Sequence, residues 1–156
     1  MSIPLYRYMR KSDIEIILDI ERSSNSYPWT KKNFLDCLEK NYYCLVQEIQ
    51  NEVSGFAIQS IAIDESHLLN IGVKKNYRRK GFGEEILNQI ILFSKVMGCK
   101  KIFLEVRISN IRAIKLYEKK GFRKVDISKN YYKLREGRED ALIMIKRLRG
   151  NWKTFL

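Results

Sequence analysis

The chain has 156 residues, 45% of them hydrophobic, which is enough for one domain with an apolar core and excludes an intrinsically disordered protein. No apolar run approaches the roughly 18 residues of a membrane-spanning helix, and the N-terminal stretch lacks the apolar core of a secretory signal, so we expect a cytoplasmic protein. The net charge of +12 favours an anionic partner, such as nucleic acid, a membrane surface or a phosphorylated cofactor, although a lysine-rich solvated surface would have the same composition.

The first half of the chain predicts a strand, two amphipathic helices and three further strands. In chain order these elements cover residues 4–9, 12–24, 27–40, 42–48, 53–63 and 66–73. Ser12 and Glu15 have the spacing of a capping box, and Thr30 is a suitable N-cap for the second helix. Only a polar turn separates the fourth element from the fifth, which predicts a hairpin.

The second half predicts helices and strands in alternation, followed by a closing pair of strands. These elements cover residues 82–98, 101–106, 109–121, 122–132 and 140–148. Gly98 is placed to end the first of these helices, and Asn110 to cap the second. The total of about seven strands and four helices predicts a mixed α/β sheet in one domain, residues 1–148, followed by a basic tail, residues 149–156. The tail mixes cations with aromatic residues, which suits either a nucleic-acid contact or a solvated terminus.

The chain has three cysteines, Cys37, Cys44 and Cys99, and a single histidine, His67. An odd number of cysteines without a C-x-x-C pair predicts neither a disulfide framework nor a zinc site, so we expect reduced thiols and no metal. Cys37 and Cys44 lie among apolar residues and are expected to pack in the core. A histidine–cysteine pair could in principle transfer an acyl group, but no third orienting residue is evident, and we expect His67 to be a strand residue near a sheet edge.

The stretch YRRKGFG, residues 77–83, joins a predicted strand to a predicted helix and sets three cations beside two glycines. The first amides of a helix have no internal partner and carry partial positive charge, and glycine lets them approach an oxygen closely, so this order suits a bound phosphate. A dinucleotide fingerprint would need glycine where Ile86 stands, and a P-loop would need Lys-Ser/Thr where Glu84 and Glu85 follow. What remains is the pattern Arg-x-x-Gly-x-Gly, at Arg78, Gly81 and Gly83.

This pattern resembles motif A of the GCN5-related N-acetyltransferases (GNAT), a family in which it holds the pyrophosphate of acetyl-coenzyme A (acetyl-CoA). The stretches LLNIGV and SNIRAIKLYEKKGF resemble the family's fourth strand and its downstream motif. LEVRISN, NYYKLREGREDALIM and YPWTKKNF are similar to the members that acetylate the N-terminal alanine of a ribosomal protein, small-subunit protein number eighteen. The resemblance runs from Tyr6 to about Leu148.

The resemblance implies the GNAT fold, with central strands splayed around acetyl-CoA, and direct acetyl transfer to an amine. The oxyanion of the tetrahedral intermediate would receive a backbone amide near Val73. The residues that would meet the cofactor, some of them through backbone groups alone, are Ile71, Gly72, Val73, Arg78, Arg79, Lys80, Gly81, Phe82, Gly83, Glu84 and Asn110.

Glu105 is the candidate general base. It lies in an apolar predicted strand, where alternation puts it on the same face as Phe103 and Arg107. Such surroundings suit a carboxylate that takes up a proton near neutral pH, although an ion pair with Arg107 would explain the same residue. In the resembled members the matching glutamate is the proton acceptor and acts through water.

Tyr117 is the candidate general acid. A phenol has an ordinary pKa of about 10, so it is protonated at neutral pH and can protonate a departing thiolate. Its position near the end of a predicted helix, beside Ile114, equally suits an aromatic core residue. In the family the matching tyrosine is the proton donor, and the asparagine matching Asn110 contacts the cofactor.

The expected function is therefore N-terminal acetylation by acetyl-CoA. The alternatives are acetylation of another small amine or of lysine, and a catalytically silent module that binds coenzyme A (CoA) or RNA. The expected partners are the ribosomal protein's N-terminal peptide and the ribosomal surface, without a membrane or specific nucleic-acid recognition. Ribosomal peptides are usually basic, so a strongly basic enzyme is poorly matched to such a substrate. Glu136, Glu139 and Asp140 could offset the positive charge of the enzyme near the peptide. Tyr131 and Tyr132 are expected to wall a narrow slot for the peptide.

Overall fold

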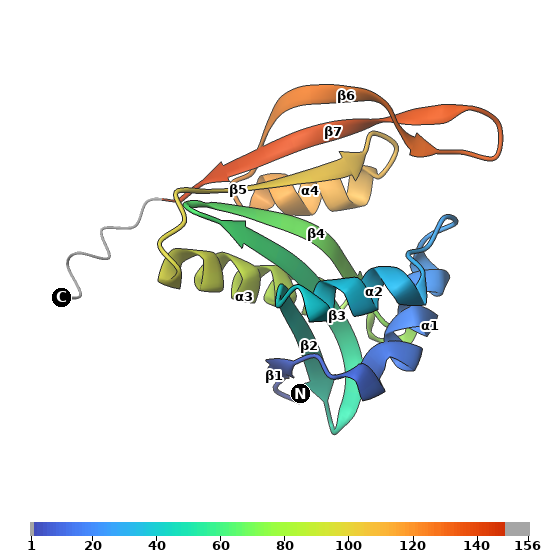
Figure 1. The fold of residues 1–156 in the computed structure, drawn as a ribbon, viewed down its shortest axis with the longest axis vertical. Helices are drawn as coiled ribbons and strands as arrows, with labels where there is room; N and C mark the ends of the chain where they lie inside the picture. The colour runs from blue at the N-terminus through green and yellow to red at the C-terminus, as the bar shows by residue number, and fades with distance from the viewer. Residues whose placement is uncertain (1, 149–156) are drawn as a thin grey trace. The chain divides into compact units, whose positions relative to one another are not determined.

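The structure is a computed structural model that describes residues 2–148, and over these residues it has the predicted mixed α/β fold (Figure 1). Its seven strands hydrogen-bond in the order β1-β2-β3-β4-β5-β7-β6, with β4 and β5 parallel, and four α-helices accompany them. No helix within this range is long and apolar enough to cross a membrane. The predicted basic tail, residues 149–156, lies outside the described residues.

The chain divides into two compact units. Unit 1 comprises residues 1–60 and 68–90, and unit 2 comprises residues 61–67 and 91–156. Strands β3 and β4 and helix α3 contribute residues to both. Unit 1 holds, in whole or in part, β1 (Leu5–Tyr8), the 3-10 helix η1 (Lys11–Asp13), α1 (Ile14–Ser24), α2 (Lys31–Glu39), β2 (Tyr43–Ile49), β3 (Glu52–Ala62), β4 (Glu65–Val73), the 3-10 helix η2 (Lys75–Tyr77) and α3 (Phe82–Val96).

The core of unit 1 is built from helices α1 and α2 and strands β2 and β3. At its centre the fully buried rings of Phe34 and Phe56 meet edge to face, with centroids 5.6 Å apart. Because side chains alternate along a strand, Val46 joins this core while Gln47 points to the opposite face. There the Gln47 Nε2 donates to the carbonyl oxygen of Phe82 at 3.2 Å, which anchors the first residue of α3.

Two local predictions in unit 1 are confirmed. Thr30 is the N-cap of α2, and its hydroxyl oxygen accepts a hydrogen bond from the amide of Asn33 at 3.2 Å. Strands β2 and β3 form the predicted hairpin, whose turn residues Gln50 and Asn51 both have positive φ, 51° and 65°. Positive φ at both central residues matches the twist of a two-residue hairpin turn.

The start of helix α1 differs from the prediction. Ser12 lies in η1 and the N-cap is Asp13, while Glu15 forms an ion pair with Lys31 at 2.9 Å. The predicted capping box of Ser12 and Glu15 is therefore wrong. The pattern matched by spacing alone, whereas the helical backbone begins earlier, in η1, where the Asp13 carboxylate has its partners.

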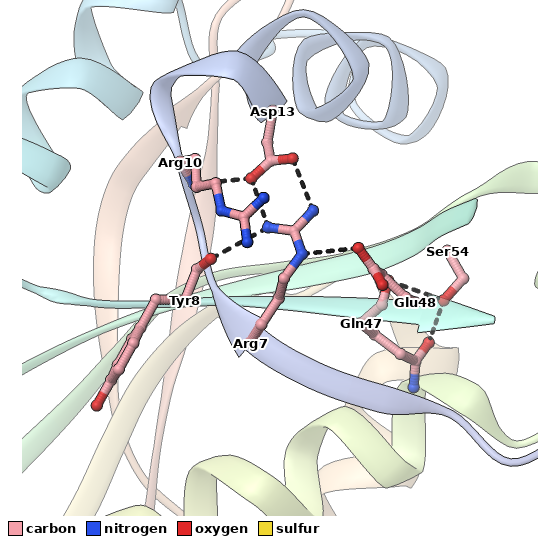
Figure 2. A network of polar contacts seen from close by, with 7 residues as sticks. All are labelled: Arg7, Tyr8, Arg10, Asp13, Gln47, Glu48 and Ser54. Carbon is pink, nitrogen blue, oxygen red and sulfur yellow. Dashed lines mark hydrogen bonds and ion pairs between the residues drawn. The ribbon is translucent and has the colours of Figure 1, made fainter. Parts of the chain in front are cut away.

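Those partners form a polar network between β1, η1 and β2 (Figure 2). The Arg7 guanidinium donates two hydrogen bonds to the Asp13 carboxylate, at 2.8 and 2.9 Å, and a third to Glu48 at 2.7 Å. The Arg10 amide also donates to Asp13, at 2.7 Å. Hydrogen bonding by Arg7 holds the pKa of Asp13 below its ordinary value, so this buried side chain stays charged near neutral pH.

Two glycines in unit 1 bring β3 and β4 into close approach. A Cβ atom placed on Gly55 would lie 2.7 Å from the carbonyl oxygen of Gly72 and 2.7 Å from Cδ1 of Ile86. A Cβ atom on Gly72 would lie 2.7 Å from the ring of Phe56. Both residues therefore owe their identity to packing beneath the end of β4, where the predicted cofactor residues begin.

Replacing Gly55 by alanine is expected to lower the free energy of unfolding by about 1–3 kcal/mol, because the new methyl group overpacks against a backbone oxygen that cannot rotate away. Gly83→Ala is the control, since its Cβ atom would lie an ordinary 3.4 Å from Cγ2 of Val73 and alanine favours a helix. Urea denaturation of the two variants measures the difference. Equal stabilities would show that the approach at Gly55 relaxes without cost.

Unit 2 carries a long antiparallel hairpin, orange to red in Figure 1. The hairpin consists of β6 (Arg123–Lys133) and β7 (Arg138–Arg147), and the unit also contains the end of α3, β5 (Lys101–Arg107) and α4 (Ile111–Lys119). Along β5, Ile102, Leu104 and Val106 are buried, so the residues between them lie on the opposite face, as predicted for Glu105. Gly98 has a φ of 79° just beyond α3, which confirms it as the helix stop.

Candidate active site

The predicted cofactor residues, apart from Asn110, lie in unit 1, at the end of β4, in the turn that follows it and at the start of α3. Arg79 and Gly81 have positive φ, 63° and 84°, on either side of Lys80. Alternation of this kind turns successive backbone N–H groups to one side, where they form a concave site for an anion. The first amides of α3 follow directly, and its first internal bond here runs from the Glu85 amide to the Gly81 carbonyl at 3.2 Å.

The two glycines of the motif are needed for different reasons. Gly81 has open space around its Cβ position but a left-handed backbone, so the turn itself selects glycine. Gly83 lies in the helix with ordinary φ, and its Cβ atom would make an ordinary contact with Val73. Folding alone therefore does not require glycine at 83, whereas a ligand that approaches the backbone closely would.

Contacts from the β2–β3 turn fix this loop in place. The Tyr77 hydroxyl donates to Glu52 at 2.7 Å, and the Lys74 ammonium pairs with the same carboxylate. The bond from Lys74 holds the pKa of Glu52 below its ordinary value. The Lys74 amide donates to the Ser54 carbonyl at 2.7 Å. The loop is thus held in one conformation by a partner in its own unit.

Arg78 makes contacts that the sequence did not indicate. Its Nε donates to the carbonyl oxygen of Val73 at 2.9 Å, and its Nη2 donates to the hydroxyls of Ser23 and Ser24 at 2.8 and 2.9 Å. The guanidinium therefore ties the end of α1 to the end of β4. Direct contact of Arg78 with the cofactor stays a prediction. The side chains of Arg79 and Lys80 are exposed at the turn.

The catalytic candidates lie together in unit 2. Nε2 of His67 lies 2.6 Å from Oε2 of Glu105, and the imidazole stacks on the ring of Phe103 with centroids 4.1 Å apart. The parallel register of β4 and β5, which pairs His67 with Phe103, brings these residues side by side. The sequence correctly predicted a strand for His67, but the expected place near a sheet edge is wrong, because β4 lies between β3 and β5. The partner Glu105 was not predicted, since it depends on a strand register that no local pattern encodes.

Arg107 contacts the β6–β7 hairpin. Its Nη1 lies 3.3 Å from Glu139, and its guanidinium lies over the ring of Tyr132, 4.4 Å from the centroid. Glu139 also accepts a hydrogen bond from the amide of Ser109 at 3.1 Å. These contacts hold the β6–β7 hairpin beside β5. They also engage Glu139, which is one of the three acids expected to face the peptide.

Tyr117 is buried, 7% exposed, and packs against Phe122 with ring centroids 5.6 Å apart. Burial raises its pKa to about 12, so the phenol is protonated throughout the neutral range. Burial also raises the pKa of Tyr132, and Tyr131, Glu105 and Tyr117 add to this rise through their charges. The guanidinium of Arg107, which lies over the Tyr132 ring, acts in the opposite direction and lowers this pKa.

Asn110 caps helix α4 as predicted, because its Oδ1 accepts a hydrogen bond from the Ala113 amide at 3.2 Å. Of the two other acids expected near the peptide, Asp140 accepts a hydrogen bond from the Asn130 amide at 2.9 Å, and Glu136 is exposed.

All three cysteines are buried and free, and burial raises the pKa of each thiol, in Cys44 to about 12. A thiol mechanism therefore has no reactive cysteine to use. Within residues 2–148, no group of three or more histidine, cysteine, aspartate and glutamate side chains is arranged to hold a metal ion.

Comparison with known proteins relates this geometry to characterised chains. The model of the acetyltransferase (GNAT) family matches residues 14–122. A ribosomal protein bS18-alanine N-acetyltransferase from Escherichia coli is 35% identical over 136 residues, covering 87% of this chain and 92% of that protein. The enzyme of the same name from Haemophilus influenzae is 39% identical over 133 residues, covering 85% and 90%.

The fold has an equally extensive match. The crystal structure of the ribosomal-protein-S18-alanine N-acetyltransferase from Escherichia coli superimposes with a TM-score of 0.88 at 32% sequence identity. The match covers 96% of this chain and 97% of that one. The sequence comparison and the structure comparison therefore both match enzymes of the same name, over nearly the whole length of the chain.

Proposed function

This chain belongs to the GNAT acetyltransferase family, and we propose that it transfers the acetyl group of acetyl-CoA to the N-terminal alanine of ribosomal protein bS18. It is an acetyl-CoA-dependent N-acetyltransferase. The observation that carries the substrate is the identity of 35% and 39% to two enzymes named for this reaction, over about nine-tenths of their length. The family model takes in residues of both units, which supports one catalytic domain over residues 1–148.

In the proposed reaction, Glu105 is the base that takes a proton from the substrate ammonium through a water molecule. The neutral amine then attacks the thioester carbonyl, and the backbone amide near Val73 stabilises the oxyanion. The position of Glu105 on the half-exposed face of β5 supports this role, because its carboxylate is 19% exposed and can be reached by water. No covalent acetyl-enzyme is needed, since both substrates are bound together.

Tyr117 is the proposed acid. As the carbon–sulfur bond breaks, its hydroxyl donates a hydrogen bond to the sulfur and then the proton that converts the thiolate to free CoA. As the intermediate collapses, the second proton on the attacking nitrogen passes through water to the Tyr117 phenolate, so the amide product is neutral and the phenol is restored. A pKa of about 12 keeps the phenol protonated in every enzyme molecule before the reaction begins.

The residues proposed to hold acetyl-CoA are those of the turn and of the flanking strand and helix. Their backbone groups, not their side chains, supply most of the contacts, which is consistent with the positive φ of Arg79 and Gly81. The proposed pyrophosphate contacts come from Arg78 to Glu84, the pantetheine contacts from Ile71, Gly72 and Val73, and a further contact from Asn110.

Basic residues dominate one segment of unit 2, which supports a contact with the ribosomal surface. Residues 112–135 contain nine lysines and arginines but only two acids. Ribosomal RNA is a polyanion, and such a segment would be drawn to it without reading its sequence. A cytoplasmic location follows from a ribosomal substrate.

A peptide panel tests the substrate class. An α-amine has a pKa of about 7.7–8.0, so roughly a third is neutral near pH 7.5, against about one lysine in a thousand. We expect acetylation of peptides that begin with alanine, much slower reaction of peptides that begin with leucine or tryptophan, and none at internal lysines. Mass spectrometry locates the acetyl group, and N-terminally blocked peptides and polyamines are the controls. Acetylated lysine in blocked peptides, with free N-terminal alanine left unreacted, would overturn the substrate assignment.

A further inference from the structure

We propose that His67 is the positioning residue of the catalytic base: its Nε2–H donates to Oε2 of Glu105 and leaves Oε1 as the oxygen that takes the substrate proton. This inference rests on the proposed role of Glu105 as base. It adds to the mechanism a residue that the motif resemblance did not indicate.

The geometry supports a fixed hydrogen bond. The Nε2 to Oε2 distance of 2.6 Å is at the short end of the range for a charge-assisted hydrogen bond to a carboxylate. Both side chains are largely covered, 23% and 19% exposed, so water competes weakly for this contact. The carboxylate therefore has one oxygen engaged by a donor within unit 2.

The imidazole is itself held in position. Its ring lies nearly parallel to Phe103, with an interplanar angle of 18°, and the backbone register pairs His67 with Phe103. Glu105 is two residues beyond Phe103 on the same face of β5, which is the diagonal position that a side chain from β4 can reach. Stacking fixes the plane of the ring, and the ring plane fixes the direction of the N–H bond.

A donor at Oε2 has two chemical consequences. It prevents rotation of the carboxylate, so Oε1 keeps one direction toward the water that carries the substrate proton. It also leaves only one oxygen free to accept, so the proton arrives and departs at the same atom. The Nε2–H group of His67 performs both tasks.

Two substitutions separate donation from stacking. His67→Gln supplies an amide nitrogen that can donate in place of Nε2 but removes the ring. His67→Phe keeps a ring to stack on Phe103 but has no donor. We expect His67→Phe to lower kcat at least about tenfold with the KM for peptide changed less than about twofold, and His67→Gln to stay within about threefold of wild type. If His67 only packed against Phe103, His67→Gln would lower kcat more than His67→Phe.

The chain has a single histidine, so an NMR experiment on histidine-labelled protein observes His67 without assignment. We expect a directly bonded proton on Nε2, and we expect this proton signal to move or vanish in Glu105→Gln. A proton on Nδ1 with Nε2 bare would overturn the proposal, and this measurement on the wild-type protein needs no variant that might fold poorly.

A double-mutant cycle distinguishes failure of this inference from failure of the proposed base. Glu105→Gln is expected to lower kcat by roughly 10²–10⁴, and His67→Phe should then add less than about twofold, because its effect acts through Glu105. If Glu105→Gln is impaired but His67→Phe is fully active, only the role of His67 is overturned. A fully active Glu105→Gln would overturn the base and the positioning role with it.

Discussion

Replacing Tyr117 by phenylalanine is expected to lower kcat by roughly 10²–10⁴, the usual contribution of general acid–base catalysis. The change removes one hydroxyl and keeps the ring that packs against Phe122, so fold and acetyl-CoA affinity should change little. Steady-state kinetics with an alanine-initiated peptide, together with calorimetric titration of acetyl-CoA, measure the two effects separately. A kcat within twofold of wild type would remove Tyr117 from the mechanism.

The pH dependence gives a second test of the same residue. Because burial raises the pKa of Tyr117 to about 12, the phenol loses its proton only as the pH approaches that value. We therefore expect kcat of the wild-type enzyme to show no fall between pH 9 and about 10.5, where a tyrosine of ordinary pKa would already be titrating. A clear fall centred near pH 10, in protein that stays folded, would contradict the burial of the acid.

Replacing Gly83 by aspartate is expected to weaken acetyl-CoA binding at least tenfold, about 1.4 kcal/mol. The substitution places a side chain and a negative charge in the first turn of α3, where the pyrophosphate is proposed to bind. An acidic residue is favourable in the first turn of a helix, so the fold should survive the change. Calorimetry measures the affinity, and circular dichroism checks the fold.

Gly83→Asn is the matched control, because asparagine has the size of aspartate without its charge. Electrostatic repulsion predicts a smaller loss for asparagine than for aspartate, and added salt should narrow the gap between them. Equal losses of acetyl-CoA affinity in the two variants would show that the size of the side chain alone causes the effect. Unchanged affinity in both variants would show that the anion site lies elsewhere.

The elements of this fold could be read from the sequence because each depends on a local pattern. Helix α3 follows from its apolar stripe and from Gly98, and the β2–β3 hairpin follows from its polar turn. The predicted bounds of β6 and β7 agree with the structure to within two residues, and a tight turn joins the end of β6 at Lys133 to the start of β7 at Arg138. That turn closes when the Leu134 amide donates to the Gly137 carbonyl at 3.1 Å.

The contacts within the candidate site could not be predicted from the sequence. Resemblance to the family motifs nominated Glu105 and Tyr117, whose roles stay predictions, whereas the hydrogen-bond partner of Glu105 is 38 residues away along the chain. Arg78 likewise finds a hydroxyl partner 55 residues away. Such contacts depend on strand register and on helix packing, which a local pattern does not specify. The capping box at Ser12 failed for a local reason, since the carboxylate of Asp13 accepts the hydrogen bond from the Arg10 amide where the helical backbone begins.

The burial of the three cysteines determines how this enzyme can be assayed. Each turnover releases one coenzyme A thiol, which a chromogenic disulfide reagent in the solution reads as colour. Cys37, Cys44 and Cys99 are 7%, 2% and 6% exposed, and burial raises the pKa of each thiol, so the protein itself should react slowly with the reagent. The folded enzyme can therefore be followed continuously at high concentration with little background, and a sudden rise in reactive thiol without substrate would report unfolding.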